Sequence, residues 1–325
     1  MNEVLIRVDS GAEAGLGHLR RCLALAAALV ERGLDPQLLV PRDEVAVAKA
    51  RGLGVAAAEL DVAPGSDDDL AAVRERAADV RALVVDSYAW HPDALAAANE
   101  LAPTVAVADL GGAFDCSLVV DGGPDAEPPK YTGSRAELLL GPRFALLSRD
   151  LWELERPAPP PEPSVLLTFG GASGRELAQL AAAVEEAAVA RVVVVAGPYA
   201  DPAEIRAIVP GADVVVAPPT LTPLFQTSSV VVTAGGQTLL EVLRIGVPAV
   251  VVEIASNQAP GIAAAAARGA VVDAGSFGDD APARVAHAVA TLLADPGERE
   301  RLSAAGRGWV DGLGARRVAE RIESL

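Results

Sequence analysis

The sequence predicts an α/β protein made of two doubly wound, Rossmann-like domains that face a cleft. Short apolar runs alternate with helix-like stretches along the whole chain, and this alternation is typical of a parallel sheet with helices on both faces. A proline-rich segment at 157–163, PAPPPEP, separates two such series. The 325 residues are enough for two domains of ordinary size.

In the first half, we expect a strand wherever a short run of β-branched and apolar residues ends in a polar or glycine-rich segment. These strands are Val4–Val8, Gln37–Val40, Val55–Leu60, Ala82–Val85, Val105–Val107 and Leu118–Val120. Between the strands, apolar residues recur three and four positions apart, which predicts amphipathic helices. The first of these helices has its apolar positions at Leu19, Cys22, Leu23, Ala26 and Val30.

The second half repeats the pattern after the proline-rich segment. Its expected strands are Val165–Thr168, Val192–Ala196, Val214–Val216, Val230–Thr233, Ala249–Val252 and Val271–Val272. We therefore predict an N-terminal domain at 1–156 and a C-terminal domain at 157–325. Ligands of such sheets bind beyond the carboxyl ends of the strands, so the loops that follow the strands should hold the site residues.

Composition and charge exclude several classes of function. The net charge of -17 and the pI near 4.6 argue against a nucleic-acid binder, which needs clustered positive charge. One diphosphate can still be held by backbone N–H groups at a helix start. Two isolated cysteines and the acidic run Asp67–Asp69, typical of a solvated helix start, predict no metal site and no cofactor. We expect no signal peptide and no membrane span, hence a cytoplasmic protein.

The segment RVDSGAEAGLGHLRRCLAL at 7–25 is the most informative one. A strand runs into a loop that contains Gly11, Gly15 and Gly17, and this loop places His18 in the first turn of a helix. Glycines let the backbone approach a ligand closely, and a histidine there can act as a general base. The alternative is that His18 only fills the helix start.

Polar residues also end two strands of the first half. Asp9 and Ser10 end the first strand, and Asp86, Ser87 and Tyr88 end the strand ALVV. Asp9 could orient the imidazole, bond a substrate, or cap the glycine loop. Tyr88 could offer its phenol to a ligand or serve as packing.

Three loops of the second half follow predicted strands. The first contains Gly170 and Gly171, which fit either a phosphate or a plain turn. The second contains Gly235, Gly236, Gln237 and Thr238, a helix start suited to an anion, and Glu241 follows one turn later, where it could accept ribose hydroxyls or balance the helix dipole. The third contains Asn257 and Gln258, whose amides could bond sugar or phosphate or cap a helix.

Five segments, taken together and in order, resemble a known family. They are RVDSGAEAGLGHLRRCLALA, VVDSYAW, LLLGPRFALL, LLTFGGAS and TAGGQTLLEVLRIGVPAVVVEIASNQ. In this order they resemble the hydrolases of pseudaminic acid biosynthesis, which act on UDP-2,4-diacetamido-2,4,6-trideoxy-β-L-altropyranose, and the related spore-coat polysaccharide proteins, which are glycosyltransferase-like. The glycine-rich second half is shared with GT-B glycosyltransferases more widely.

The resemblance implies a GT-B fold in which the C-terminal domain binds UDP and the N-terminal domain faces the sugar. It implies that His18 activates water at the anomeric carbon, with inversion, release of UDP and no metal. It also implies that Glu241 contacts the ribose, that Gly235 to Thr238 hold the diphosphate, and that Asn257 and Gln258 lie near phosphate and sugar. Arg21 and Tyr88 match further positions of the family.

The chain departs from that family at 109–125, where it has ADLGGAFDC and VVDGGPDA, so we expect a different sugar site. We predict a metal-independent UDP-sugar hydrolase with an acetamido or amino deoxy sugar as substrate. The alternative is an inverting GT-B glycosyltransferase in which His18 deprotonates a sugar acceptor. A third possibility is a nucleotide-sugar sensor without catalysis.

Overall fold

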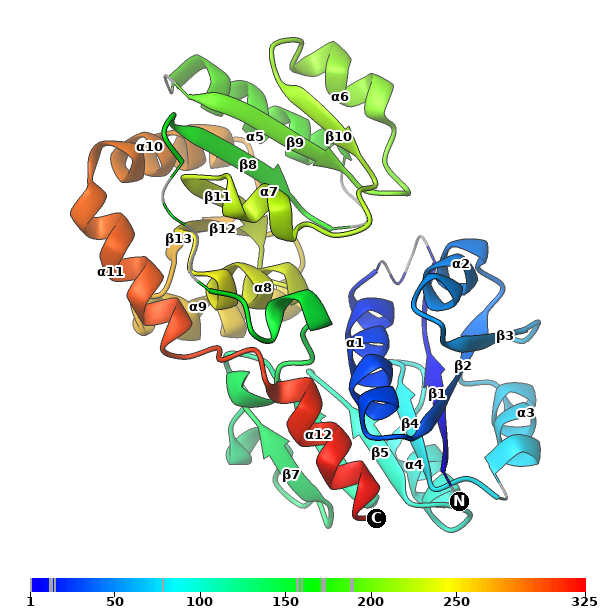
Figure 1. Ribbon diagram of the computed structural model, residues 1–325. Coiled ribbons are helices and arrows are strands. Elements are labelled where there is room, and N and C mark those ends of the chain that lie inside the picture. The colour runs from blue at the N-terminus through cyan, green and yellow to red at the C-terminus, as the bar shows by residue number, and fades with distance from the viewer. Residues whose placement is uncertain are drawn as a thin grey trace. The chain divides into compact units, whose positions relative to one another are not determined.

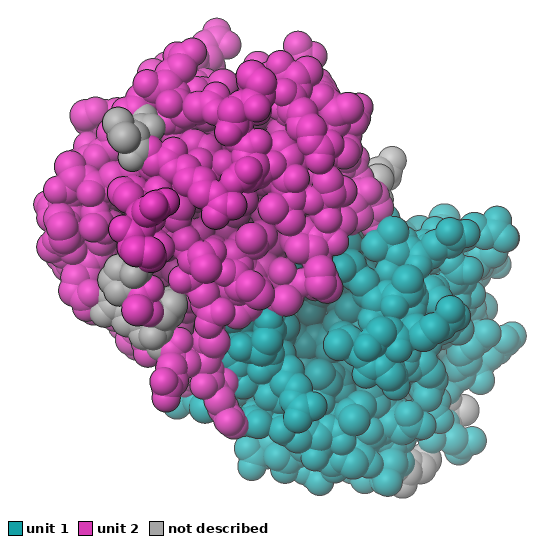
Figure 2. All heavy atoms as spheres, turned by 45° about the horizontal axis from the view of Figure 1, so that its top comes forward, with its two compact units in different colours: residues 1–152, 312–325 teal, residues 153–311 magenta. Residues whose placement is uncertain are grey.

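Two parallel sheets organise the chain (Figure 1). The computed structural model describes residues 2–11, 14, 16–77, 79–155, 158, 160–170, 174–187 and 190–325. The chain divides into two units, coloured separately in Figure 2. Unit 1 consists of Met1–Trp152 and Gly312–Leu325, and unit 2 consists of Glu153–Asp311.

Within the described residues, unit 1 has a seven-stranded sheet in the order β3-β2-β1-β4-β5-β6-β7, and each neighbouring pair is parallel. Its strands are β1 (Glu3–Val8), β2 (Asp35–Pro41), β3 (Ala56–Leu60), β4 (Ala82–Asp86), β5 (Thr104–Val107), β6 (Leu118–Asp121) and β7 (Glu137–Leu140). Its helices are α1 (Gly17–Glu31), α2 (Glu44–Gly52), α3 (Asp67–Ala77), α4 (Pro92–Asn99) and α12 (Gly314–Glu323), with short 3-10 helices at Pro128–Tyr131, Pro142–Phe144 and Arg149–Leu151.

Unit 2 has a six-stranded parallel sheet among its described residues, in the order β10-β9-β8-β11-β12-β13. Its strands are β8 (Ser164–Thr168), β9 (Arg191–Ala196), β10 (Asp213–Val216), β11 (Val230–Ala234), β12 (Ala249–Glu253) and β13 (Val272–Ser276). Its helices are α5 (Gly174–Ala187), α6 (Pro202–Ile208), α7 (Thr222–Gln226), α8 (Gln237–Ile245), α9 (Ala259–Ala267), α10 (Ala281–Ala294) and α11 (Pro296–Arg307), with a 3-10 helix at Ser256–Gln258.

The central strands of both sheets are almost completely buried, because helices cover the sheet faces. All five residues of β4, of β8 and of β11 are buried, which explains their continuous Val and Leu runs rather than an alternating pattern. This confirms the predicted fold class of two α/β domains with parallel sheets. The sequence patterns missed β7, a four-residue strand at the sheet edge whose Leu138, Leu139 and Leu140 are only partly buried.

The last helix departs from the predicted domain ranges. The sequence-based ranges placed all of 157–325 in the second domain, whereas Gly312–Leu325 belongs to unit 1. In α12, the face with Ala315, Val318 and Ile322 is buried, and α12 lies against α1 (Figure 1). The chain therefore returns to its first unit after completing the second.

In the acidic run at 67–69, Asp67 and Asp68 are exposed at the start of α3 as predicted, but Asp69 is not. Asp69 is fully buried and pairs with the equally buried Arg7 of β1, with Nε to Oδ1 at 2.8 Å and Nη2 to Oδ2 at 2.9 Å. Trp90 Nε1 donates to the same carboxylate at 2.9 Å. Burial alone would raise the pKa of Asp69, but the Arg7 hydrogen bonds and charge lower it. Arg7 thus joins β1 to the start of α3.

Candidate active site

Four neighbouring strands of unit 1 end in aspartates. Asp86 and Asp121 are the last residues of β4 and β6, while Asp9 and Asp109 follow β1 and β5 directly or one residue later. Since β1, β4, β5 and β6 are adjacent and parallel, these carboxylates lie in a row along the carboxyl edge of the sheet. This is the edge where α/β sheets bind ligands.

His18 contacts this row through Asp86. Its Nδ1 lies 2.5 Å from Asp86 Oδ1, and both side chains are buried. A carboxylate oxygen accepts, so Nδ1 carries the hydrogen and the ring lone pair is left on Nε2. Among the alternatives for Asp9, orientation of the imidazole belongs instead to Asp86, and the Asp9 carboxylate accepts from Arg7 Nη1 at 3.1 Å.

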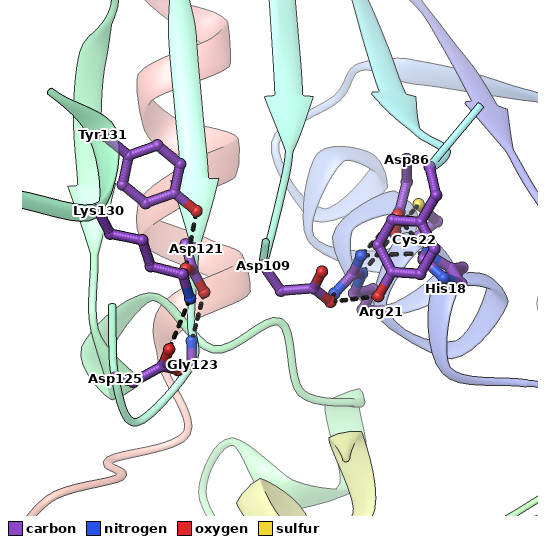
Figure 3. A network of polar contacts seen from close by, with 11 residues as sticks. His18, Arg21, Cys22, Asp86, Asp109, Asp121, Gly123, Asp125, Lys130 and Tyr131 are labelled. Atoms are coloured by element: carbon purple, nitrogen blue, oxygen red, sulfur yellow. Dashed lines mark hydrogen bonds and ion pairs between the residues drawn. The ribbon is translucent and has the colours of Figure 1, made fainter. Parts of the chain in front are cut away.

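Arg21 binds the same carboxylate from the next turn of α1. Its Nε donates to Asp86 Oδ2 and its Nη2 to Asp86 Oδ1, both at 2.6 Å, and its Nη1 donates to Asp109 Oδ2 at 2.9 Å. Burial alone would raise the pKa of Asp86, but the charge of Arg21 and the hydrogen bonds from Arg21 and His18 hold it far below its usual range. Figure 3 shows Arg21 between the two carboxylates.

Tyr88 is the half-exposed member of this network and contacts both His18 and Asp109. Its ring meets the His18 ring edge to face, with centroids 4.6 Å apart at 84°, and its hydroxyl donates to Asp109 Oδ2 at 3.0 Å. Burial and the Asp109 charge raise the pKa of Tyr88 well above its usual value, so the phenol stays protonated. The Oδ1 atom of Asp109 is buried and has no hydrogen-bond partner among the described residues.

A second polar cluster follows β6 (Figure 3). Asp121 Oδ2 accepts from Tyr131 OH at 2.8 Å and from Lys130 Nζ at 3.1 Å. Lys130 Nζ also donates to Asp125 Oδ2 at 2.8 Å. Asp121 and Asp125 lie within 109–125, the segment expected to line a different sugar site, and Lys130 and Tyr131 bind them from a few residues beyond it.

The loop before α1 is only partly within the described residues. Gly17 begins α1, and a Cβ placed on it would meet nothing within 4 Å, so its backbone is open to a ligand. Gly11 has a φ of +109°, a conformation that favours glycine. Gly15 lies outside the described residues.

In unit 2, the loop between β11 and α8 has the predicted form of a helix start. Gly236 is the N-cap of α8, with no side-chain cap, and Gln237 and Thr238 begin the helix. Gly235 is needed for close packing, since a Cβ there would lie 2.6 Å from Ile262 Cγ1, whereas Gly236 faces open space. Glu241 is buried within α8, at 5% exposure.

The predicted amide pair has two different environments. Gln258 Oε1 accepts from the backbone N–H groups of Ile254 at 3.1 Å and Gly235 at 3.3 Å, so this oxygen joins the two loops. Asn257 is exposed, and no side chain caps the start of α9 in the part of the chain that is described. Asn257 is therefore the amide that remains accessible.

Gly170 follows β8 and has a φ of +82° with open space around its missing side chain. Gly171 lies outside the described residues. Across the described ranges, no three or more His, Cys, Asp or Glu side chains are grouped to hold a metal ion. None of the described helices combines the length and apolarity that a membrane crossing requires.

No family model matches the sequence, and no curated protein matches it. Solved structures do match its fold. The glycosyltransferase of kitacinnamycin superposes with a TM-score of 0.70 at 22% identity, covering 99% of this chain and 98% of that one. MurG of Acinetobacter baumannii gives 0.67 at 14% identity, and the Streptomyces sp. SF2575 glycosyltransferase SsfS6, complexed with thymidine diphosphate, gives 0.67 at 17%, each covering 100% of both chains.

The chain has the GT-B fold. At these identities the matches establish architecture, so the finer resemblance to pseudaminic acid hydrolases stays a prediction. In this GT-B chain, sequence reasoning selected His18, Arg21 and Tyr88, which the structure brings together. It placed Asp86 at the same edge without a role, and it named Asp109 only as the first residue of the segment expected to line a different sugar site. For Asp86 the available signal was the ending Val-Val-Asp, which closes both β4 and β6, whereas Asp109 follows β5 after Val-Ala.

Proposed function

We propose that the chain is an inverting glycosyltransferase that moves a sugar from a UDP- or TDP-linked donor to an acceptor, with His18 as general base. The observation that carries this proposal is the buried His18–Asp86 pair at the carboxyl edge of the unit 1 sheet. The fold supports it, because glycosyltransferases share it over the full chain.

The chemistry follows from the tautomer of His18. With Nδ1–H bonded to Asp86, Nε2 takes the proton of an acceptor hydroxyl, and the hydroxyl oxygen attacks the anomeric carbon. The bond from that carbon to the diphosphate oxygen breaks, and the nucleoside diphosphate leaves with the electron pair. A positioned base of this kind contributes about 10² to 10⁴ in rate.

Unit 2 would bind the nucleotide. The uncapped start of α8, with Gly235, Gly236, Gln237 and Thr238, suits the diphosphate. Asn257 would contact sugar or phosphate. We assign Glu241 to the ribose, where its burial would make the contact selective for hydroxyls.

Two exposed apolar side chains favour an organic acceptor that carries a hydroxyl group over water. Tyr88 is 49% exposed and Leu110, next to Asp109, is 57% exposed. Such side chains beside a polar site provide packing area for an acceptor or sugar face. Hydrolysis is the second candidate, because the segment Gly15–Cys22, GLGHLRRC, resembles the group that contains the hydrolases and the spore-coat proteins. Water would then replace the acceptor in the same step.

The test is release of UDP or TDP from a panel of acetamido and amino deoxy sugar donors, with and without hydroxyl acceptors. We expect acceptor-dependent release that falls about 10² to 10⁴-fold in His18→Ala, with His287→Ala, an exposed histidine of α10, as the matched control. Full turnover in His18→Ala would overturn the proposal. Stoichiometric free sugar without acceptor would establish the hydrolase, and tight binding without turnover in either protein would indicate a sensor.

A further inference from the structure

Arg21 is placed to control the charge of the His18 ring. Its Nη2 and the His18 Nδ1 both approach one atom, Asp86 Oδ1, at 2.6 Å and 2.5 Å, and they lie 3.1 Å from each other. Both nitrogens are donors to that shared oxygen. A second proton on the ring would therefore create an imidazolium in direct contact with a guanidinium.

Asp86 alone would have the opposite effect. A buried carboxylate against an imidazole favours the imidazolium, which has no lone pair on Nε2 and cannot act as a base. Arg21 neutralises that carboxylate through two hydrogen bonds of 2.6 Å. Asp86 can then fix the ring orientation and its tautomer without charging it.

We propose that Arg21 is the positioning residue that keeps His18 neutral and Nδ1-protonated. Its catalytic consequence rests on the proposed function, but the protonation state is a property of the free protein. The start of α1 acts in the same direction, because His18 lies in the first helical turn, where the helix dipole disfavours a cation.

The other groups around the ring do not replace Arg21. The Cys22 thiol donates to Asp86 at 3.4 Å, and burial and the Asp86 charge raise its pKa, so it stays neutral. The Tyr88 phenol also stays protonated. Asp109 lies on the far side of Arg21 and accepts from it, so removal of the guanidinium leaves Asp86 and Asp109 without the cation that pairs with both.

The experiment is an NMR titration of the histidine ring protons in the free, full-length protein. The chain has three histidines, and His91 and His287 are exposed, so these two serve as internal references for folding. We compare Arg21→Gln, which removes the charge, with Arg21→Lys, which keeps the charge but loses the two-pronged contact.

In Arg21→Gln, we expect the titration midpoint of His18 to move to higher pH by about one unit, a tenfold change in the protonated fraction. In Arg21→Lys, we expect the midpoint to stay near that of the wild type. An unmoved midpoint in Arg21→Gln, or equal shifts in both variants, would overturn the proposal, because a purely structural role predicts equal shifts.

Asp109→Asn keeps the proposal testable should Arg21→Gln not fold. It removes an acceptor of Arg21 and leaves more of the guanidinium charge to act on Asp86 and His18, so we expect the His18 midpoint to move to lower pH. An upward movement would overturn the proposal. Absence of glycosyl transfer with every donor would sink the proposed function while leaving these titrations interpretable.

Discussion

Asp86 has no acceptor capacity left for a substrate. A carboxylate has about four lone-pair sites, and Asp86 accepts from His18 Nδ1, from two nitrogens of Arg21, and from Cys22 Sγ. Its side chain is fully buried. At the residue scale, Asp86 therefore positions His18 and leaves the Nε2 of that ring for a ligand.

Removal of one partner from the buried pair of Arg7 and Asp69 should strongly destabilise unit 1. We expect Asp69→Asn or Arg7→Met alone to lower the free energy of unfolding by about 3–5 kcal/mol. Arg7→Met leaves the buried Asp69 carboxylate without its guanidinium, and Asp69→Asn leaves the buried Arg7 with Asp9 as its remaining ion-pair partner. The double variant should lose less than the sum. Urea unfolding followed by circular dichroism measures all three.

The pair of Arg191 and Asp213 in unit 2 is the matched control. Its side chains are 65% and 55% exposed with Nε to Oδ2 at 2.6 Å, so its removal should cost about 0–1 kcal/mol. If Asp69→Asn were as mild as Asp213→Asn, the buried pair would not have the role assigned to it here.

The site residues that the sequence predicted have a local sequence signal, whereas those that it missed depend on contacts between distant residues. Tyr88 stands out because it closely follows the end of a strand, and His18 because a glycine-containing loop places it at a helix start. The partner of His18 does not, because Asp86 is 68 positions away and becomes adjacent only when β4 pairs with β1. Asp69 could not be recognised as buried for the same reason, because its partner Arg7 is 62 positions away in the sequence.

At the scale of elements, the two glycines before α8 have different structural roles. Gly235 packs against Ile262 and Gln258, while Gly236 borders open space at the helix start. We expect Gly235→Ala to lower the thermal midpoint, because the loop must shift to admit a methyl group. Gly236→Ala should keep the midpoint and weaken UDP and TDP binding, because its methyl group would project into the proposed diphosphate site.

Thermal unfolding and titration calorimetry of the two variants separate these effects. Equal binding of nucleotide by Gly236→Ala and wild type would remove the α8 start from the proposed site. A Gly235→Ala variant as stable as wild type would show that the Ile262 side chain yields readily.

Helix α12 shows what a local pattern cannot supply. Its buried stripe indicates that it packs on something, but the partner is set by contacts far away in the sequence. A Cβ on Gly314 would lie 2.3 Å from Ala145 O, and Arg316 pairs with both oxygens of Glu31 at 2.8 Å. These contacts within unit 1 are why the chain end departs from the predicted domain ranges.

At the scale of the whole molecule, each unit has its own sheet and its own buried core. The hydrophobic runs of the sequence predicted most strands, their parallel pairing and the two-domain organisation. They could do so because a buried strand is recognisable from a few consecutive residues. That the two domains face a cleft stays a prediction.

The cysteines are distributed unequally, since Cys22 and Cys116 both lie in unit 1 and unit 2 has none.

This distribution makes thiol labelling a selective probe of unit 1. Burial raises the pKa of Cys116 to about 11, so at pH 8 about one thiol in a thousand is ionised, and Cys22 is buried against the Asp86 carboxylate. We expect both thiols of the native protein to react with a disulfide reagent about 10³-fold more slowly than an introduced thiol in Val30→Cys, a position on α1 that is 51% exposed.

In increasing urea, labelling should accelerate only as unit 1 opens, whereas circular dichroism follows both units. Rapid labelling of the native cysteines at zero urea would contradict the buried environment of Cys22, and with it the closed packing of α1 against β4 on which the position of His18 depends.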